Sequence, residues 1–130
     1  MLRPSRAGRP PGSGIVFIDH FAVVPGRREG GVGSETLRLL VRRFPDRSIL
    51  LEVEEPDEAR AAAERALRAR RIRFYERAGY RVTAVRVRVF GNALRILTSG
   101  GSDAESRADI GQIYDAMFPA PELRRQLTVL

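Results

Sequence analysis

The residues best suited to chemistry form a glycine-rich segment, Arg28-Glu29-Gly30-Gly31-Val32-Gly33-Ser34, between an apolar run and an amphipathic pattern. Backbone N–H groups at the start of a helix have no partner within the helix, and the helix dipole favours an anion there. Glycine lets the backbone approach such an anion closely. The segment lacks the Gly-Lys-Ser/Thr of a Walker loop and the spacing of the dinucleotide fingerprint. By itself it fits a pyrophosphate site and a tight connector equally well.

Three side chains could transfer protons. Tyr75 has an aromatic neighbour, and an aromatic on an apolar helix face is usually part of the core. Asp19 shares a strand face with Phe17, where it could act as a general base or pair with an arginine. His20 points to the opposite face and is the only group whose ordinary pKa lies near neutrality. We interpret His20 as a hydrogen-bonded structural residue.

Composition limits the classes of function. The 130 residues suit one domain, and 43% hydrophobic with 30% charged residues is the balance of a soluble globular protein, for which the cytoplasm is the default location. No cysteine and one histidine exclude a thiolate nucleophile and argue against a metal site. The net charge of +7 comes from arginines without any lysine, spread along the chain. This spread favours solvated surface arginines over a nucleic-acid footprint.

The elements that must position the candidate residues begin after an Arg/Pro/Gly tail at residues 1–14, which we expect to be flexible. Residues 15–130 form the expected domain. Ile15 to Val24 predicts a strand covered on both faces, and Ser48 to Val53 predicts a second buried strand. Between them, a helix that ends near Pro45 is predicted by apolar residues at helical spacing: Leu37, Leu40, Val41 and Phe44.

A second helix is predicted from Asp57, as N-cap, to Ala78, with a break near Arg70 and Gly79 at the C-terminal stop position. The acidic run Glu52 to Glu58 precedes it. This run is interpreted as a solvated loop, although it could also attract a cationic amine.

The last third of the chain predicts a hairpin and a closing helix. Tyr80 to Phe90 alternates and is joined to Ala93 to Thr98 by a turn at Gly91-Asn92. The closing helix ends at Pro119 and has one apolar stripe: Ile110, Ile113, Tyr114 and Met117. With parallel pairing of the first two strands and the hairpin added at one edge, we predict a mixed α/β class with about four strands and three helices.

Two segments resemble signatures of the GNAT N-acetyltransferase superfamily. Arg28 to Gly33 matches Q/R-x-x-G-x-G/A and follows Phe21-Ala22-Val23-Val24-Pro25, which is similar to the family's LAV-x-P entry. Phe74-Tyr75-Glu76-Arg77-Ala78-Gly79-Tyr80 is similar to the family's FYxxxGF segment, at about the separation the family uses. The resemblance covers residues 15 to 98 and implies a GNAT-like acyltransferase fold.

The resemblance implies an activity and a set of roles. The enzyme would transfer an acetyl group directly from acetyl-CoA to a primary amine, without a metal. Backbone groups at Val23 and Val24 would face the pantetheine arm, Tyr75 would protonate the leaving thiolate, and Asp19 is the candidate base. The pyrophosphate would be bound by backbone amides of the glycine-rich segment: Arg28, Glu29, Gly30, Gly31, Val32, Gly33 and Ser34.

The chain also departs from the family pattern. Arg68 stands where many members have an asparagine seven residues before the tyrosine, and only residues 1–14 precede the strand that members reach after about three strands and two helices. We therefore expect an N-terminally truncated version with an uncovered sheet edge, which a second copy could cover. The alternatives are an inactive CoA-binding or interaction module and an arginine-rich nucleic-acid-binding protein.

Overall fold

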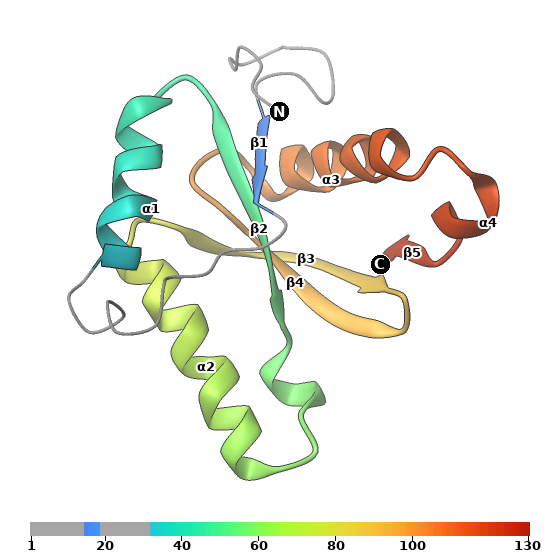
Figure 1. Cartoon of the computed structure of the whole chain (residues 1–130), viewed down its shortest axis with the longest axis horizontal. Coiled ribbons are helices and arrows are strands. Elements are labelled where there is room, and N and C mark those ends of the chain that lie inside the picture. The colour runs from blue at the N-terminus through green and yellow to red at the C-terminus, as the bar shows by residue number, and fades with distance from the viewer. Residues whose placement is uncertain (1–14, 19–31) are drawn as a thin grey trace.

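The computed structural model describes residues 15–18 and 32–130 of the chain (Figure 1). The described part is a mixed α/β fold, in agreement with the predicted class. In chain order its elements are β1 (Ile15–Ile18), α1 (Val32–Arg43), β2 (Ser48–Glu54), a 3₁₀ turn (Pro56–Glu58), α2 (Ala62–Arg77), β3 (Arg81–Val89), β4 (Asn92–Thr98), α3 (Asp103–Met117), α4 (Pro121–Arg124) and β5 (Leu127–Val129).

The five described strands form one sheet in the order β1-β2-β4-β3-β5. β1 runs parallel to β2, with Ile15 opposite Ser48 and Ile18 opposite Leu51. All other pairs are antiparallel. The predicted parallel pairing and the added hairpin are therefore confirmed, and β4 lies between β2 and β3 because the hairpin folds back toward the parallel pair.

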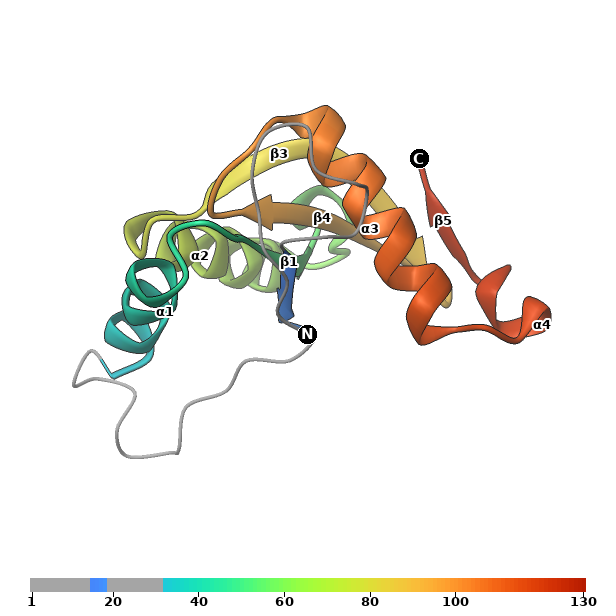
Figure 2. The same ribbon diagram turned by 90° about the horizontal axis from the view of Figure 1, so that it is seen from above.

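Each face of the sheet buries its own apolar cluster, because successive side chains of a strand point to opposite faces. α1 and α2 lie over one face and α3 over the other, an arrangement visible in both ribbon views (Figures 1 and 2). The cluster between the sheet and the helices α1 and α2 has seven buried residues: Leu37, Ile49, Leu51, Val53, Ala78, Tyr80 and Leu97. Those under α3 are Leu50, Val85, Val87, Ile96, Ile110, Tyr114 and Leu127.

The two predicted helices before the hairpin differ in how well their ends were placed. α1 ends at Arg43, two residues before Pro45, as expected. α2 does not begin at Asp57, which lies in the 3₁₀ turn that Pro56 starts; its N-cap is Ala61. The predicted break near Arg70 is also wrong, since the Ala/Arg-rich sequence has enough helix propensity to continue to Arg77. Gly79 then adopts φ +102°, as expected for a helix stop.

The hairpin was predicted correctly except for its turn. Val89 pairs with Asn92, so the loop residues are Phe90 and Gly91 rather than Gly91-Asn92. Both loop residues have positive φ, 48° and 85°, as a type I′ turn requires. Phe90 tolerates this conformation because its backbone N–H donates to Gln126 and its ring packs edge-on against another ring.

The C-terminal part of the chain contains α3 and two further elements, α4 and β5. α3 starts with a capping box in which Ser102 accepts from the Glu105 N–H and the Glu105 carboxylate accepts from the Ser102 N–H. α4 and β5 were not predicted, so the described part has five strands and four α-helices rather than about four and three. β5 is only three residues long, and its buried Leu127 joins the core under α3.

Candidate functional site

Most residues of the predicted cofactor site lie outside the described residues. These are Val23, Val24, Arg28, Glu29, Gly30 and Gly31, together with the candidate base Asp19, and also His20 and the tail at residues 1–14. Val32, Gly33 and Ser34 are described, and they form the first turn of α1. The end of the glycine-rich segment is therefore the start of a helix, as the sequence predicted.

The first turn of α1 lies toward the carboxyl ends of the parallel strands. α1 ends at Arg43, a short distance before β2 begins at Ser48, and β2 runs in the same direction as β1. The helix therefore runs back along the pair, as Figure 1 shows. The N–H groups of its first turn, which have no partner within the helix itself, point away from the amino ends of β1 and β2. In α/β sheets, ligands bind at the carboxyl ends of the strands.

The segment Phe74 to Tyr80 contacts α1, the helix that continues from the other family-like segment. The hydroxyl of Tyr80 donates to the backbone oxygen of Leu37 over 3.2 Å, and both side chains are buried. The guanidinium of Arg38 donates to the backbone oxygen of Arg77 over 3.4 Å. Leu37, Ala78 and Tyr80 also share one core cluster. The C-terminal end of α2 is therefore fastened to the middle of α1.

Tyr75 lies in the last turns of α2, half-buried at the edge of the same cluster. Its ring packs edge-on against Phe74 with 5.4 Å between centroids. Burial raises the pKa of the Tyr75 phenol, and the nearby Arg71 opposes this only in part. The hydroxyl therefore holds its proton at neutral pH, which is what a general acid requires.

Tyr80 differs from Tyr75 in both burial and titration. Burial raises the pKa of Tyr80 to about 12, with Tyr75 adding a smaller contribution in the same direction. Its hydroxyl is already used by the backbone of α1. We assign Tyr80 a structural role, in which it positions the end of α2 that carries Tyr75.

The acidic run at Glu52 to Glu58 is not a solvated loop, contrary to our interpretation of the sequence. Glu52 accepts a hydrogen bond from the Tyr114 hydroxyl across the face under α3. Glu54 contacts Arg68 and Arg71 at 3.1 Å each. Glu55, which follows the last residue of β2, is buried. Glu54, Asp57 and Glu58 are exposed, but of these three only Glu54 forms an ion pair between described residues.

Glu55 lies between two arginines of the hairpin. Arg86 and Arg95 are directly opposite each other in the antiparallel pair of β3 and β4, where like charges repel. The Glu55 carboxylate accepts from Arg95 at 3.0 and 3.1 Å and lies 3.3 Å from Arg86. The single negative charge of the carboxylate therefore offsets part of the repulsion between the two arginines.

Arg68 stands at the expected asparagine position, and its guanidinium is bound by other groups of the same chain. Its guanidinium donates to Glu64 at 3.1 Å and to the backbone oxygen of Glu55 at 2.9 Å, and it also pairs with Glu54. Only 17% of the side chain is exposed. It ties α2 to the end of β2, so the departure from the family pattern has a structural explanation.

The sequence did not single out the Glu52–Tyr114 pair. Glu52 had been grouped with the acidic loop, and Tyr114 with the apolar stripe of the closing helix. A signal was present, because a lone carboxylate within an otherwise apolar buried strand needs a polar partner. Which residue supplies that partner depends on how α3 crosses the sheet.

Comparisons with protein-family models, with curated proteins and with solved structures find no match to this chain. Within residues 15–18 and 32–130, no group of three or more His, Cys, Asp or Glu side chains is placed to hold a metal ion. No helix in the same part of the chain has the length and apolar character needed to cross a membrane.

Proposed function

We propose that this chain is an N-acetyltransferase of the GNAT type, which transfers an acetyl group from acetyl-CoA directly to a primary amine. The observation that supports it is the contact between the segment Phe74 to Tyr80 and α1, the helix that continues from the glycine-rich segment. The Tyr80 hydroxyl bonds the Leu37 backbone, so the segment with Tyr75 is fixed against the helix that begins at Val32. This contact links the helix whose first turn would bind the anion to the segment that carries the proposed acid, Tyr75.

Each of these linked parts has a chemical task. The N–H groups of the glycine-rich segment, ending at Val32, Gly33 and Ser34, would bind the pyrophosphate of CoA with help from the helix dipole. The amine nitrogen attacks the thioester carbonyl, the C–S bond breaks, and Tyr75 gives its proton to the thiolate sulfur. Asp19 is the proposed acceptor of the proton that the amine loses. The cytoplasm is the proposed location.

Isothermal titration with acetyl-CoA tests the binding step. We expect Gly31→Glu to weaken binding tenfold or more, because a carboxylate there would repel the phosphates from the segment's N–H groups. Gly100→Glu is the matched control: it adds the same charge at a glycine whose added Cβ would meet nothing within 4 Å. Gly100 follows β4, near the amino end of β2 and away from the proposed site. Wild-type protein that binds no acetyl-CoA would refute the proposal.

Turnover, measured as CoA release across a panel of primary amines, tests the role of Tyr75. Tyr75→Phe keeps the ring that packs on Phe74 and removes only the hydroxyl. We expect kcat to fall roughly a hundredfold, within the range for loss of a general acid, with acetyl-CoA affinity unchanged. An unchanged kcat would leave Tyr75 as a core residue only. Acetyl-CoA binding without turnover of any amine would instead identify a CoA-binding module.

A further inference from the structure

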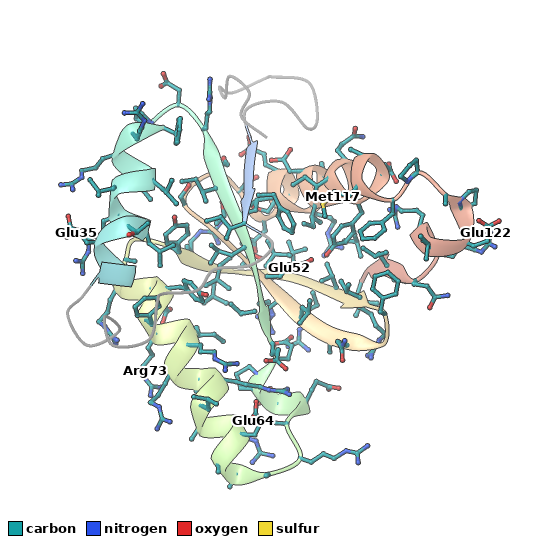
Figure 3. The ribbon with its side chains drawn as sticks, viewed as in Figure 1. Glu35, Glu52, Glu64, Arg73, Met117 and Glu122 are labelled. Carbon is teal, nitrogen blue, oxygen red and sulfur yellow. The ribbon has the colours of Figure 1, made fainter. Side chains whose placement is uncertain are left out.

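Three arginines of α2 form a row on the side of the helix that faces away from the sheet. Arg70, Arg73 and Arg77 are separated by three and four residues, the spacing that keeps side chains on one helix face. All three are exposed. Figure 3 shows Arg73 extending outward from α2. We call this set the arginine ridge.

The ridge side chains take no part in holding the fold together. None of the three guanidinium groups forms an ion pair or hydrogen bond with another residue in the described part of the chain. The other arginines of α2 are engaged: Arg68 and Arg71 pair with Glu54, and Arg65 donates to the backbone oxygen of Ala59. The charge of the ridge is therefore available to a binding partner.

The surroundings of the ridge suit a charged and extended partner. Ala62, Ala63 and Ala66 are exposed on the same helix, so no bulky side chain blocks approach along its first turns. Of the two carboxylates of α2, Glu64 is bound by Arg68. The other, Glu76, is exposed beside Arg77 at the C-terminal end of the ridge. An exposed helix face for insertion into a lipid surface would instead carry large apolar residues.

We propose that the arginine ridge binds the sugar-phosphate backbone of a nucleic acid. Arg70 and Arg77 lie about 10 Å apart along the helix axis at about 1.5 Å per residue. One strand of a duplex has a phosphate about every 3.4 Å along its axis, so this length matches about three phosphates. Guanidinium groups bind phosphate in a bidentate manner, which lysine cannot do. The net charge of +7 adds long-range attraction to a polyanion.

Arg77, at one end of the ridge, lies two residues from Tyr75, so the experiment below includes acetyl-CoA to distinguish the ridge from the proposed cofactor site. The sequence favoured solvated arginines because they are scattered along the chain, whereas α2 brings three of them into one row. Interactions made only with phosphates do not depend on base sequence. The proposal therefore describes non-specific binding, with a dissociation constant that rises steeply with salt.

Fluorescence anisotropy of a labelled duplex DNA and a labelled single-stranded RNA, each of about 20 nucleotides per strand, tests the proposal. The variant R70Q/R73Q/R77Q lowers the net charge from +7 to +4. We expect at least a tenfold loss of affinity at about 50 mM salt. The slope of log affinity against log salt should fall by about 3 on duplex DNA, roughly one for each phosphate that the ridge no longer neutralises.

The matched control is R43Q/R60Q/R125Q, which removes the same charge from exposed arginines on separate parts of the fold. We expect this control to weaken binding less than threefold. Equal decreases in affinity for the two variants, or no binding by the wild type to either nucleic acid, would overturn the proposal. So would displacement of the nucleic acid by equimolar acetyl-CoA, because the ridge would then belong to the cofactor site. A preference between the DNA and RNA arms identifies which of the two the ridge accepts.

Discussion

The two sides of α2 use the same residue type in opposite ways. Toward the sheet, Arg68 is 17% exposed and is held by Glu54, Glu64 and the backbone of Glu55. On the outward side, Arg70 and Arg73 are exposed and have no carboxylate partner among the described residues. The difference arises because only the inward side passes over the acidic end of β2.

This contrast extends to the hairpin, where Arg86 and Arg95 share Glu55. We call these inward interactions the arginine–glutamate network; it comprises Glu54, Glu55, Glu64, Arg68, Arg71, Arg86 and Arg95. The contrast separates arginines that hold the fold together from the ridge arginines that we propose to bind a nucleic acid. Variants that remove members of each set should therefore separate stability from binding.

Loss of the buried Glu55 carboxylate should have the largest effect. Glu55→Ala leaves Arg86 and Arg95 opposite each other without a counter-charge, and Arg95 is 17% exposed. We expect the free energy of unfolding to fall by about 3 kcal/mol, the lower end for breaking a buried ion pair. Urea denaturation measures it. Glu58→Ala removes an exposed carboxylate nearby, and a comparable decrease there would show that Glu55 has no special position.

Loss of the arginine between α2 and β2 should have the next largest effect. Arg68→Ala removes charge-assisted hydrogen bonds to Glu64 and to the backbone of Glu55. The expected decrease in unfolding free energy is about 2 kcal/mol, within the range for hydrogen bonds to charged groups. Arg70→Ala, two residues along the same helix, is the control. If both variants unfold at the same urea concentration, the distinction between the two sides of α2 is wrong.

The ion pair at the start of α3 should respond to acid. The Arg81 side chain first, and the Ala84 N–H second, hold the pKa of Asp103 below its ordinary value of 3.8. A carboxyl with a lowered folded-state pKa stabilises the fold above the unfolded value, and the contribution is lost as pH falls through the folded value. Wild type should therefore be more stable than Asp103→Asn at about pH 7. Urea melts at about pH 3 should show a smaller difference, and a constant difference would contradict the assignment.

Removal of the ridge should have the smallest effect on stability. The variant R70Q/R73Q/R77Q breaks no ion pair or hydrogen bond between described residues, so its unfolding free energy should stay within about 0.5 kcal/mol of wild type. Circular dichroism melts at low and high salt measure this. A larger decrease would assign the ridge a structural role and weaken the case for nucleic-acid binding.

Local sequence patterns predicted the elements well where side-chain spacing alone decides them. The alternation of Tyr80 to Phe90 predicted the hairpin strand, and the repeat from Leu37 to Phe44 predicted α1. Errors occurred where a backbone conformation decides the outcome. The turn was placed one residue late because Phe90 adopts a positive φ that its type disfavours, and this depends on interactions with the C-terminal segment.

The candidate site divides in the same way. The sequence predicted a helix after the glycine-rich segment, and Val32 to Ser34, the end of that segment, already form the first turn of α1. It did not predict the partners of Glu55, because Arg86 and Arg95 reach it only through the register of β2, β3 and β4. Nor did it predict the pairing of Arg68 with Glu54, which depends on how α2 packs across the end of β2. Most other residues of the site lie outside the described ranges, so their roles stay predictions.

The sequence by itself determined the mixed α/β class, the order of its main elements and the excess of positive charge, because these follow from local periodicity and residue counts. Tertiary structure alone decided which arginines are neutralised. Helix and strand spacing set which side each guanidinium occupies, but only the packing of α2 across the end of β2 supplies carboxylates to one side and leaves the other to solvent. Ion pairs between distant segments depend on that packing, and no pattern within one segment encodes it.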